Sequence, residues 1–385
     1  MRALAWCRSS AWLSATALGA TLLGAPVHSG VLPEDRADVL FHRYSGGGIT
    51  IQGPSVLVRK KLGDSVSLAA NYYVDMVSSA SIDVVTQASP YKERRTQYSL
   101  SADVLHGKST YSGGYITSRE NDYQSKTAFL SVSQDMFGDL TTVSFGASRG
   151  WDKVGERGNP SFSQPLDRSS WSAGLTQVLT RNLLGTLNIE TNESEGFLNN
   201  PYRQVRYIDP LASQGYSRQL ERYPHTRTGN AAALELKYYL PWRAALDGSY
   251  RFYEDTWGIR AHTARIGYLQ PWRNFTFDTR LRYYQQSKAD FYSDLFPFLN
   301  AQNFLARDRE LATFKSTTIG LTATWQFNVG RLSWLDKGTL NFSWDKLQFK
   351  YDDYRDTRVH TLVPGTEPLY VLDADVLQFF ISVWF

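Results

Sequence analysis

The chain has 385 residues, including 54 aromatic residues, and its 41 basic and 37 acidic residues nearly balance. This length suits roughly two or three soluble domains or one large all-β domain. No run of about 18 apolar residues occurs beyond the N-terminus, which excludes an α-helical membrane protein. The single cysteine excludes a disulfide scaffold and a thiolate metal cluster.

The first 29 residues read as a secretory signal peptide. Arg2 and Arg8 precede an apolar stretch from Ala11 to Ala25, and small residues allow cleavage near Ser29. Cys7 precedes the apolar stretch, which argues against a lipoprotein. We therefore expect residues 1–29 to be removed and residues 30–385 to form one domain. The remaining 39 basic and 37 acidic residues leave a charge of +2, which is too small to favour nucleic acid as a partner.

From about residue 35 onward, apolar and polar residues alternate with a period of two, as in strands with one apolar and one polar face. Residues 274–286 are an example. One face carries Phe275, Phe277, Leu281 and Tyr283, and the other carries Thr276, Asp278, Arg280 and Arg282. A dry sandwich core would not tolerate polar faces with charges of both signs.

Segment length distinguishes a membrane barrel from a soluble sandwich. Most segments run for about ten to thirteen residues, and a tilted membrane strand needs about nine to eleven. Short turns alternate with long polar loops near residues 78–93, 152–167, 194–226, 287–312 and 352–371, which is the bacterial outer-membrane arrangement. We predict an all-β fold: a transmembrane antiparallel β-barrel of about 16 strands. The segments are 35–44, 48–60, 65–77, 94–105, 108–119, 124–135, 140–151, 168–180, 183–193, 227–239, 243–255, 258–270, 274–286, 313–327, 337–350 and 372–385.

The last strand carries a specific signal. Its outward face is apolar at every second position: Leu377, Phe379, Ile381, Val383 and Phe385. Such a strand, ending in Phe, resembles the signal that the barrel-assembly machinery recognises in outer-membrane proteins. We expect this strand to close the barrel.

Several segments spread over the mature chain resemble one family. They include Asp38–Tyr44 with the glycines that follow, Asn71–Asp75, Tyr91–Arg95, Ser133–Gly138, Asn199–Arg203, Asp290–Pro297 and Pro364–Tyr370. The chain resembles a Gram-negative family catalogued as domain of unknown function 3570. The resemblance implies an outer-membrane β-barrel and brings no established activity or catalytic residue. Members look like neighbours of secreted thioredoxin-like and flavin-transferring proteins, which implies possible envelope redox proteins as partners.

A barrel of this size is wide enough to hold water. The predicted inward face carries ten charged residues: Asp75, Asp103, Glu235, Lys237, Asp247, Arg251, Arg265, Asp278, Arg280 and Arg282. They suit either an aqueous pore that sorts small solutes by charge or a polar lumen whose charges pair and carry no selectivity. The mixed signs argue against strong anion or cation selectivity.

The loop from Gly196 to Arg227 is the longest, and about thirty irregular residues are uncommon without a function. It is rich in arginine: Arg203, Arg206, Arg218, Arg222 and Arg227. In one interpretation it folds into the lumen as a constriction whose guanidinium groups bind anionic or planar solutes. In the other, it is an exposed loop that contacts lipopolysaccharide.

The loop 287–312 is unusually apolar, with residues such as Phe291, Phe296 and Phe304, and we expect it to pack into the barrel mouth as a partial plug or to cover the rim. Oxygen ligands for a hard cation such as calcium occur there as well: Asp290, Asp294, Asp308 and Glu310. They lack a fixed ligand spacing, so we do not predict a metal site.

Evidence for catalysis is weak. No histidine pair has zinc-ligand spacing, and no nucleophile can be assigned beside His262, which lies on an apolar face. We expect no enzyme activity and no cofactor. The predicted function is passive diffusion of small hydrophilic solutes across the outer membrane of a Gram-negative bacterium, in contact with lipid and lipopolysaccharide. The alternatives are a non-conducting scaffold for envelope redox or surface partners and, third, an outer-membrane hydrolase.

Overall fold

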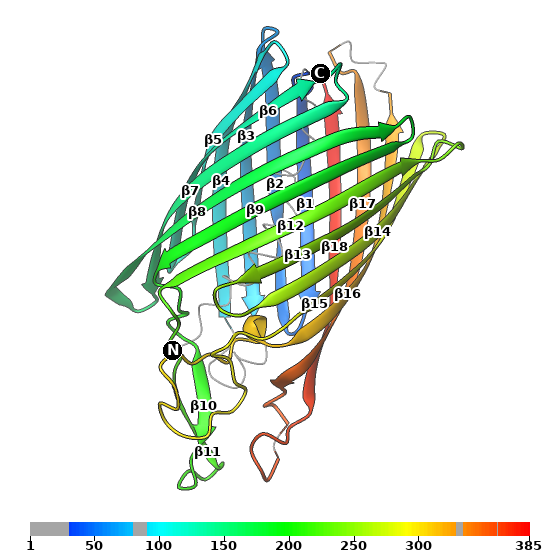
Figure 1. The fold of residues 1–385 in the computed structure, drawn as a ribbon. Helices are drawn as coiled ribbons and strands as arrows, with labels where there is room; N and C mark the ends of the chain where they lie inside the picture. Colours follow the sequence, from blue (N-terminus) through cyan, green and yellow to red (C-terminus); the bar gives the residue numbers. More distant parts are fainter. Residues whose placement is uncertain (1–30, 80–90, 329–333, 360) are drawn as a thin grey trace.

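The computed structural model describes residues 31–79, 91–328, 334–359 and 361–385. The predicted signal peptide, residues 1–29, lies outside the described residues. The described residues form a closed antiparallel barrel of sixteen strands (Figure 1). The first eight are β1 (Arg36–Gly46), β2 (Ile49–Leu62), β3 (Val66–Ser79), β4 (Tyr91–His106), β5 (Ser109–Arg119), β6 (Tyr123–Met136), β7 (Thr141–Glu156) and β8 (Asn159–Thr180). The other eight are β9 (Leu183–Gly196), β12 (Thr226–Tyr239), β13 (Ala245–Asp255), β14 (Arg260–Trp272), β15 (Phe275–Gln286), β16 (Phe314–Phe327), β17 (Lys337–Arg355) and β18 (Leu369–Trp384).

The first and last strands close the barrel. β1 pairs antiparallel with β18 from Arg36 opposite Trp384 to Gly46 opposite Ala374. Closure leaves no unpaired edge strand, so backbone amides and carbonyls in the membrane region find partners within the sheet. The predicted fold, the strand number and closure by the C-terminal strand are confirmed.

The two faces of the strands follow the predicted alternation. Apolar side chains such as Leu130, Phe277 and Ile319 are exposed on the outside, and polar side chains of the intervening positions lie inside. In the terminal strand, Leu377, Phe379 and Ile381 are exposed on the outer face, and the Lys60 ammonium lies 4.9 Å from the ring centroid of Phe385. In a bilayer, this outer surface faces hydrocarbon.

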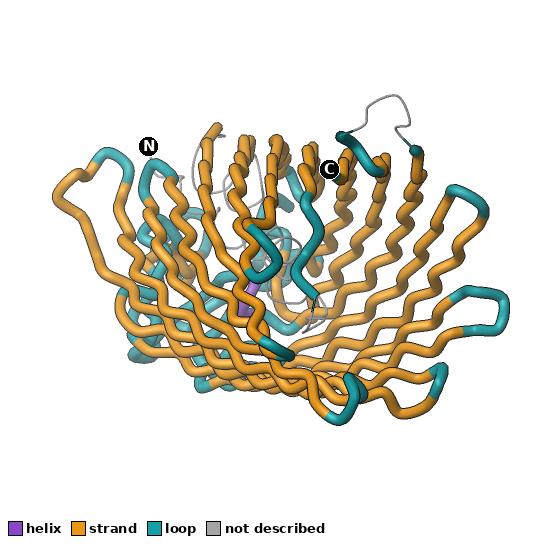
Figure 2. The backbone as a smooth tube through the Cα atoms, turned by 90° about the horizontal axis from the view of Figure 1, so that it is seen from above, coloured by secondary structure: helices purple, strands orange, loops and turns teal. Residues whose placement is uncertain are grey.

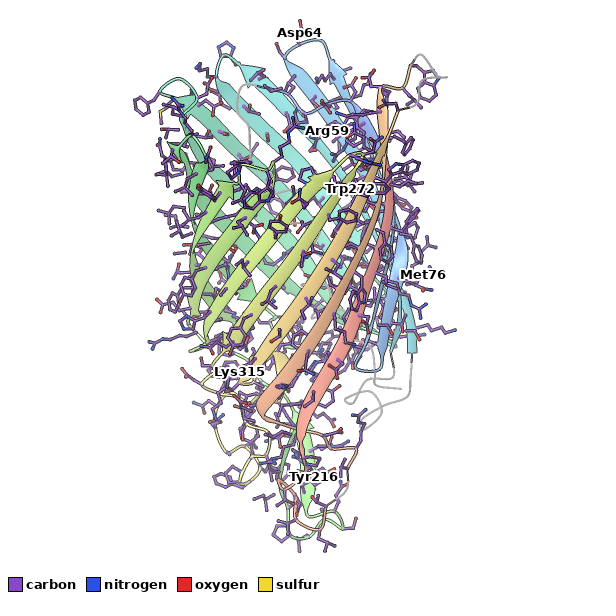
Figure 3. All side chains as sticks on the ribbon, turned by 90° about the vertical axis from the view of Figure 1, so that its right-hand side faces the viewer. Arg59, Asp64, Met76, Tyr216, Trp272 and Lys315 are labelled. Carbon is purple, nitrogen blue, oxygen red and sulfur yellow. The ribbon has the colours of Figure 1, made fainter. Side chains whose placement is uncertain are left out.

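The two ends of the barrel differ. Tight turns occupy one end, where Asp64 lies, and long connections extend from the other, where Tyr216 lies (Figure 3). The long-loop end also carries a separate hairpin of β10 (Gln204–Ile208) and β11 (Tyr216–Leu220), which lies beyond the barrel (Figure 1). β9 and β12 are therefore barrel neighbours although two strands separate them in sequence.

The predicted loop 152–167 is wrong. β7 continues to Glu156 and β8 begins at Asn159, so the two strands form a long hairpin with a tight turn at Gly158, where φ is +82°. Backbone hydrogen bonds hold the two strands of this hairpin together, so it needs no apolar face. Its polar sequence therefore resembles that of a loop. At its base, Arg168 pairs with Asp152 at 2.7 Å, and Asp152 lies one residue past the predicted end of the strand, so the inward phase continues there.

Among the described residues, three long connections fill the long-loop end. We call residues 197–225, 287–313, 356–359 and 361–368 together the cap. In Figure 2 the strands form a ring, and loops and the 3-10 helix η1 (Arg309–Leu311) lie within its outline. The cap has two buried apolar centres, one around Tyr223, Phe291 and Tyr292, and a smaller one of Val205, Phe296 and Leu305.

Candidate functional site: the lumen and its capped mouth

One wall of the lumen is charged and wet. Arg265 of β14 reaches Asp247 of β13 at 3.0 Å and Glu235 of β12 at 3.5 Å. The side chains of Arg265 and Glu235 are 38% and 39% exposed, although both point into the barrel. A partly exposed ion pair inside the ring requires water beside it. This wall therefore borders an aqueous space.

The charges on this wall are compensated in pairs. Arg280 of β15 spans β16 to reach Asp345 of β17 at 2.8 Å, and Arg251 of β13 approaches Glu190 of β9 at 3.5 Å. Pairing charges of opposite sign leaves a small net field. A passage along this wall is therefore expected to discriminate only weakly between cations and anions.

The structure places all ten predicted lumen residues on the inward phase of their strands. Besides the paired residues above, Asp103 accepts a hydrogen bond from the Ser112 hydroxyl at 2.6 Å. Lys237 stands opposite Asp247 in the β12–β13 register, and the Arg282 guanidinium lies 5.2 Å from the Tyr284 ring centroid. Asp278 is half-buried on the same face, and Asp75 belongs to a buried group described below.

The neighbouring strands β17 and β18 are dry near the mouth. Leu347 and Tyr351 of β17 and Leu372 of β18 point inward and are buried by residues of the loop 287–313. Phe291 and Tyr292 supply much of this cover. The prediction that the apolar loop packs into the barrel mouth is confirmed, although Phe298, Leu299 and Phe304 stay exposed.

Buried ion pairs hold the cap together. Arg206 of β10 contacts both Asp294 and Glu367, and Arg307 reaches Asp294 at 2.8 Å. The Arg206 and Arg307 side chains are almost fully buried. Arg206, Asp294 and Glu367 come from three different connections, so the three loops of the cap form one packed unit.

Two of the five arginines of the loop 196–227 lie outside the lumen. The hairpin that carries Arg206 and Arg218 lies beyond the barrel (Figure 1). The remaining arginines make contacts in the cap or at the rim: Arg203 with Asp308 at 3.0 Å, Arg222 with Asn300 at 3.1 Å and Arg227 with Asp255 at 2.6 Å. Sequence composition identified these arginines but not their partners, many of which are distant in sequence.

Two of the four acids of the loop 287–312 have arginine partners. Asp294 pairs with arginines, and Asp308 pairs with Arg203 while its side chain accepts a hydrogen bond from the Glu310 amide at 2.9 Å at the start of η1. Trp257 at the same end is buried beside Tyr223 and Phe291. In contrast, Trp151, Trp242 and Trp272 are exposed, as expected for aromatic residues at a membrane interface.

A buried polar row crosses the barrel wall near the mouth. His42 Nε2 of β1 lies 2.8 Å from Asp75 Oδ1 of β3, and Asp75 Oδ2 lies 3.7 Å from Arg95 Nη1 of β4. The ring of Tyr73 stacks on His42 with centroids 4.9 Å apart. The row reaches across β2 at Gly53, whose lack of a side chain leaves space above the strand.

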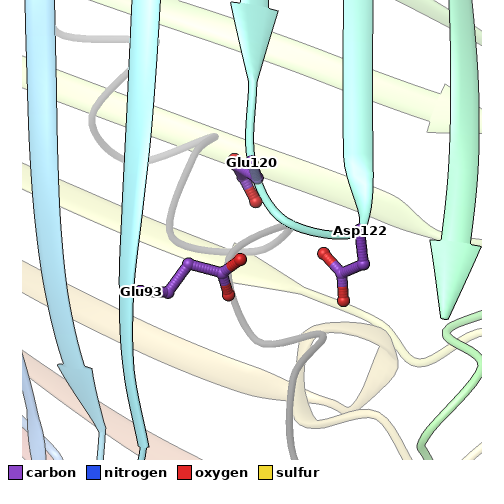
Figure 4. Close-up of side chains that lie close together, drawn as sticks. All are labelled: Glu93, Glu120 and Asp122. Carbon is purple, nitrogen blue, oxygen red and sulfur yellow. The ribbon is translucent and has the colours of Figure 1, made fainter. Parts of the chain in front are cut away.

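Beside this row, three acids converge at the mouth. Carboxylate oxygens of Glu93, Glu120 and Asp122 all lie within 4.8 Å of one another (Figure 4). Burial raises the pKa of Glu120 to about 8, although Arg95 approaches it at 4.0 Å. Tyr202 of the cap donates a hydrogen bond from its hydroxyl to Asp122 at 2.8 Å.

Sequence reasoning missed this cluster. Glu93 lies two residues before Arg95 on β4, so both side chains point into the barrel. Glu120 and Asp122 lie on either side of one residue in the turn between β5 and β6. The phase of β4 predicts an inward Glu93, but only the register of β4 with β5 and β6 brings the three acids together.

The architecture defines the class of protein: a closed sixteen-stranded barrel with an apolar outer surface, short turns at one end and long loops at the other, as in outer-membrane β-barrels. Among the described residues, no helix combines the length and apolar character needed to cross a bilayer. The family model described as "Protein of unknown function (DUF3570)" matches residues 82–350, and the chain belongs to this family. No curated protein matches the chain.

Solved structures with similar folds are outer-membrane proteins. The siderophore receptor PirA from Pseudomonas aeruginosa is 12% identical with a TM-score of 0.44, covering 91% of this chain and 63% of the receptor. A bacterial polysaccharide outer membrane secretin is 8% identical with a TM-score of 0.46, covering 92% of this chain and all of the secretin. OmpT, an outer membrane protein of Vibrio cholerae, is 9% identical with a TM-score of 0.42, covering 92% of this chain and all of OmpT.

Proposed function

We propose that this protein is an outer-membrane diffusion channel for small hydrophilic solutes, with the capped, long-loop end facing the outside of the cell and lipopolysaccharide surrounding its rim. The wet charged wall carries the proposal. The Arg265–Glu235 pair lies inside the barrel yet remains more than a third exposed, which supports a hydrated passage along β9 and β12 to β15. Its paired charges favour weak ion selectivity.

The cap restricts this passage from the long-loop end. Because the Arg206–Asp294 and Arg206–Glu367 pairs are buried, removing one partner leaves an uncompensated charge and costs about 3–5 kcal/mol. Asp294→Ala removes the acid shared by Arg206 and Arg307 and should loosen the cap. Asp209→Asn, at the solvent-exposed end of the β10–β11 hairpin, is the matched control.

Planar-bilayer recording of the purified full chain tests the proposal. We expect discrete ion-permeable openings from the wild type, larger or more frequent openings from Asp294→Ala, and wild-type openings from Asp209→Asn. A silent wild type together with a silent, folded Asp294→Ala would contradict a channel.

Exposed apolar residues on the cap favour a second candidate, a scaffold that binds a surface or envelope redox partner. Leu211 is 98% exposed, and Phe298 and Leu299 are also exposed. Exposed apolar side chains gathered on the outer loops are typical of a protein-binding surface. A non-conducting barrel would make this the leading function.

A further inference from the structure

We propose that Glu93, Glu120 and Asp122 bind one calcium ion, which fastens the cap to the barrel wall. The ligands come from the beginning of β4 and from the turn between β5 and β6. In Figure 4 their carboxylates point toward one another. The proposal concerns a ligand site and does not depend on the barrel conducting solutes.

An acidic turn is common on protein surfaces, so Glu120 and Asp122 alone would not indicate a site. Glu93 supplies the independent observation. It belongs to a different element and is 4% exposed, and its Oε2 atom has no hydrogen-bond partner among the described residues. Its Oε1 atom accepts a hydrogen bond from the Asn121 amide at 3.1 Å, which aims the carboxylate at the two acids of the turn.

The local concentration of acidic groups also favours a bound cation. Three carboxylates meet at the cluster, and Asp75 lies nearby. Arg95 is shared between Asp75 at 3.7 Å and Glu120 at 4.0 Å, too far for a close ion pair with either. A buried carboxylate oxygen without a partner is unfavourable, and a bound cation would satisfy it.

The donor set and its spacing fit calcium. All three ligands are oxygens, which excludes the nitrogen and sulfur donors typical of zinc. Calcium binds oxygen at about 2.3–2.6 Å, so any two ligands of one ion stand no more than about 5.2 Å apart. The three carboxylate oxygens, all within 4.8 Å of one another, satisfy this limit. Calcium also tolerates irregular oxygen geometries, whereas magnesium, at about 2.0–2.1 Å, demands a near-ideal octahedron.

The site connects the wall to the cap. Asp122 Oδ2 accepts the hydrogen bond from Tyr202, whose hydroxyl oxygen in turn accepts one from the Arg157 amide at 2.6 Å. An ion on Asp122 would therefore position Tyr202 and the cap segment that follows it, Arg203 included. Calcium binding should make this part of the cap more resistant to proteolysis.

Isothermal titration of calcium chloride into the metal-depleted, full-length barrel in detergent micelles tests the site. We expect one calcium ion per chain and an affinity for magnesium that is lower by about tenfold or more. Glu120→Gln and Asp122→Asn should each weaken calcium binding by about tenfold or more. Glu195 is an exposed acid on β9 at the same end of the barrel. The Glu195→Gln variant is the matched control and should bind calcium as the wild type does.

Heat-modifiable electrophoretic mobility establishes that each variant is folded. Because Glu120 and Asp122 lie in a turn, these two variants keep the test informative even where Glu93→Gln fails to fold. Absence of calcium binding by the folded wild type would overturn the proposal. Equal binding by the wild type and the Glu120→Gln, Asp122→Asn double variant would do the same. Neither measurement uses conductance, so the channel and the calcium site fail independently.

Discussion

His42 and Asp75 form a buried hydrogen bond across a strand that contains neither of them. His42 lies on β1 and Asp75 on β3, and their side-chain atoms approach to 2.8 Å over Gly53 of β2. A Cβ atom at Gly53 would lie 1.8 Å from the carbonyl oxygen of Val74, so only glycine lets β2 and β3 approach this closely. The pair and the glycine are one structural unit.

Gly53→Ala should therefore destabilise the barrel. Relief of the clash with Val74 requires the strands to move apart, which we expect to lower the free energy of unfolding by about 1–3 kcal/mol. Urea unfolding of the barrel in lipid vesicles, followed by tryptophan fluorescence, measures the change. Gly248→Ala is the control, because the nearest atom to its added Cβ is 4.0 Å away. Equal unfolding of both variants would contradict the role of Gly53.

The buried pair itself should show strong coupling. Both side chains are nearly inaccessible to water, so replacing either partner weakens a hydrogen bond that water cannot restore. In a double-mutant cycle of His42→Gln and Asp75→Asn, we expect a coupling energy of about 1–3 kcal/mol in urea unfolding. The same cycle on the exposed pair Lys108 and Asp139 should give less than about 1 kcal/mol. Additive effects at His42 and Asp75 would mean that the contact contributes little.

The sequence predicted the strands of this region but not the buried polar row of His42, Asp75 and Arg95. Alternation in β1 and β3 places Asp75 on the inward face from sequence alone, because a shift of one residue would expose charge to hydrocarbon. Which inward residues become neighbours depends on register between strands, and sequence patterns carry little information on register. The same reason explains why Glu93 was not linked to Glu120 and Asp122.

The cap shows a second limit. The apolar residues of 287–312 predicted burial in the mouth, because exposed aromatic surface is unfavourable in water. The positions and partners of the arginines could not be predicted from residue type in the same manner. Arg206 has a stable buried position only because Asp294 and Glu367 come from two other connections. Composition identifies charged groups, whereas the packing of loops distant in sequence determines their partners.

Cap stability should decrease as the pH rises, because of Glu221. This residue is buried, accepts hydrogen bonds from the Arg307 amide at 2.7 Å and the Tyr223 hydroxyl at 2.6 Å, and burial raises its pKa from 4.5 to about 7. A raised acid pKa means that the folded cap prefers the protonated form. The stabilisation is complete below pH 4.5 and is lost as the pH rises through 7.

We expect Glu221→Gln to remove this dependence. Between pH 5 and 8, hydrogen exchange of the Arg307 amide, corrected for its intrinsic rate, should show the wild-type cap losing up to about 3 kcal/mol of opening free energy. Glu221→Gln should lose much less. Glu254→Gln, an exposed acid at the rim, should keep the wild-type profile. A wild-type profile that is flat with pH would contradict the assignment.

The paired charges of the wet wall determine ion preference in the proposed channel. Arg265 balances Asp247 at 3.0 Å and Glu235 at 3.5 Å, so Arg265→Gln leaves two carboxylates facing the lumen without their cation. Cations should then concentrate in the passage, and the reversal potential in a potassium chloride gradient should shift toward that of potassium. Arg260→Gln removes a positive charge from an exposed rim position whose side chain is 74% accessible, and should leave the reversal potential close to the wild-type value because salt screens exposed charges. An equal shift in both variants would place the permeation path away from the β12–β14 wall.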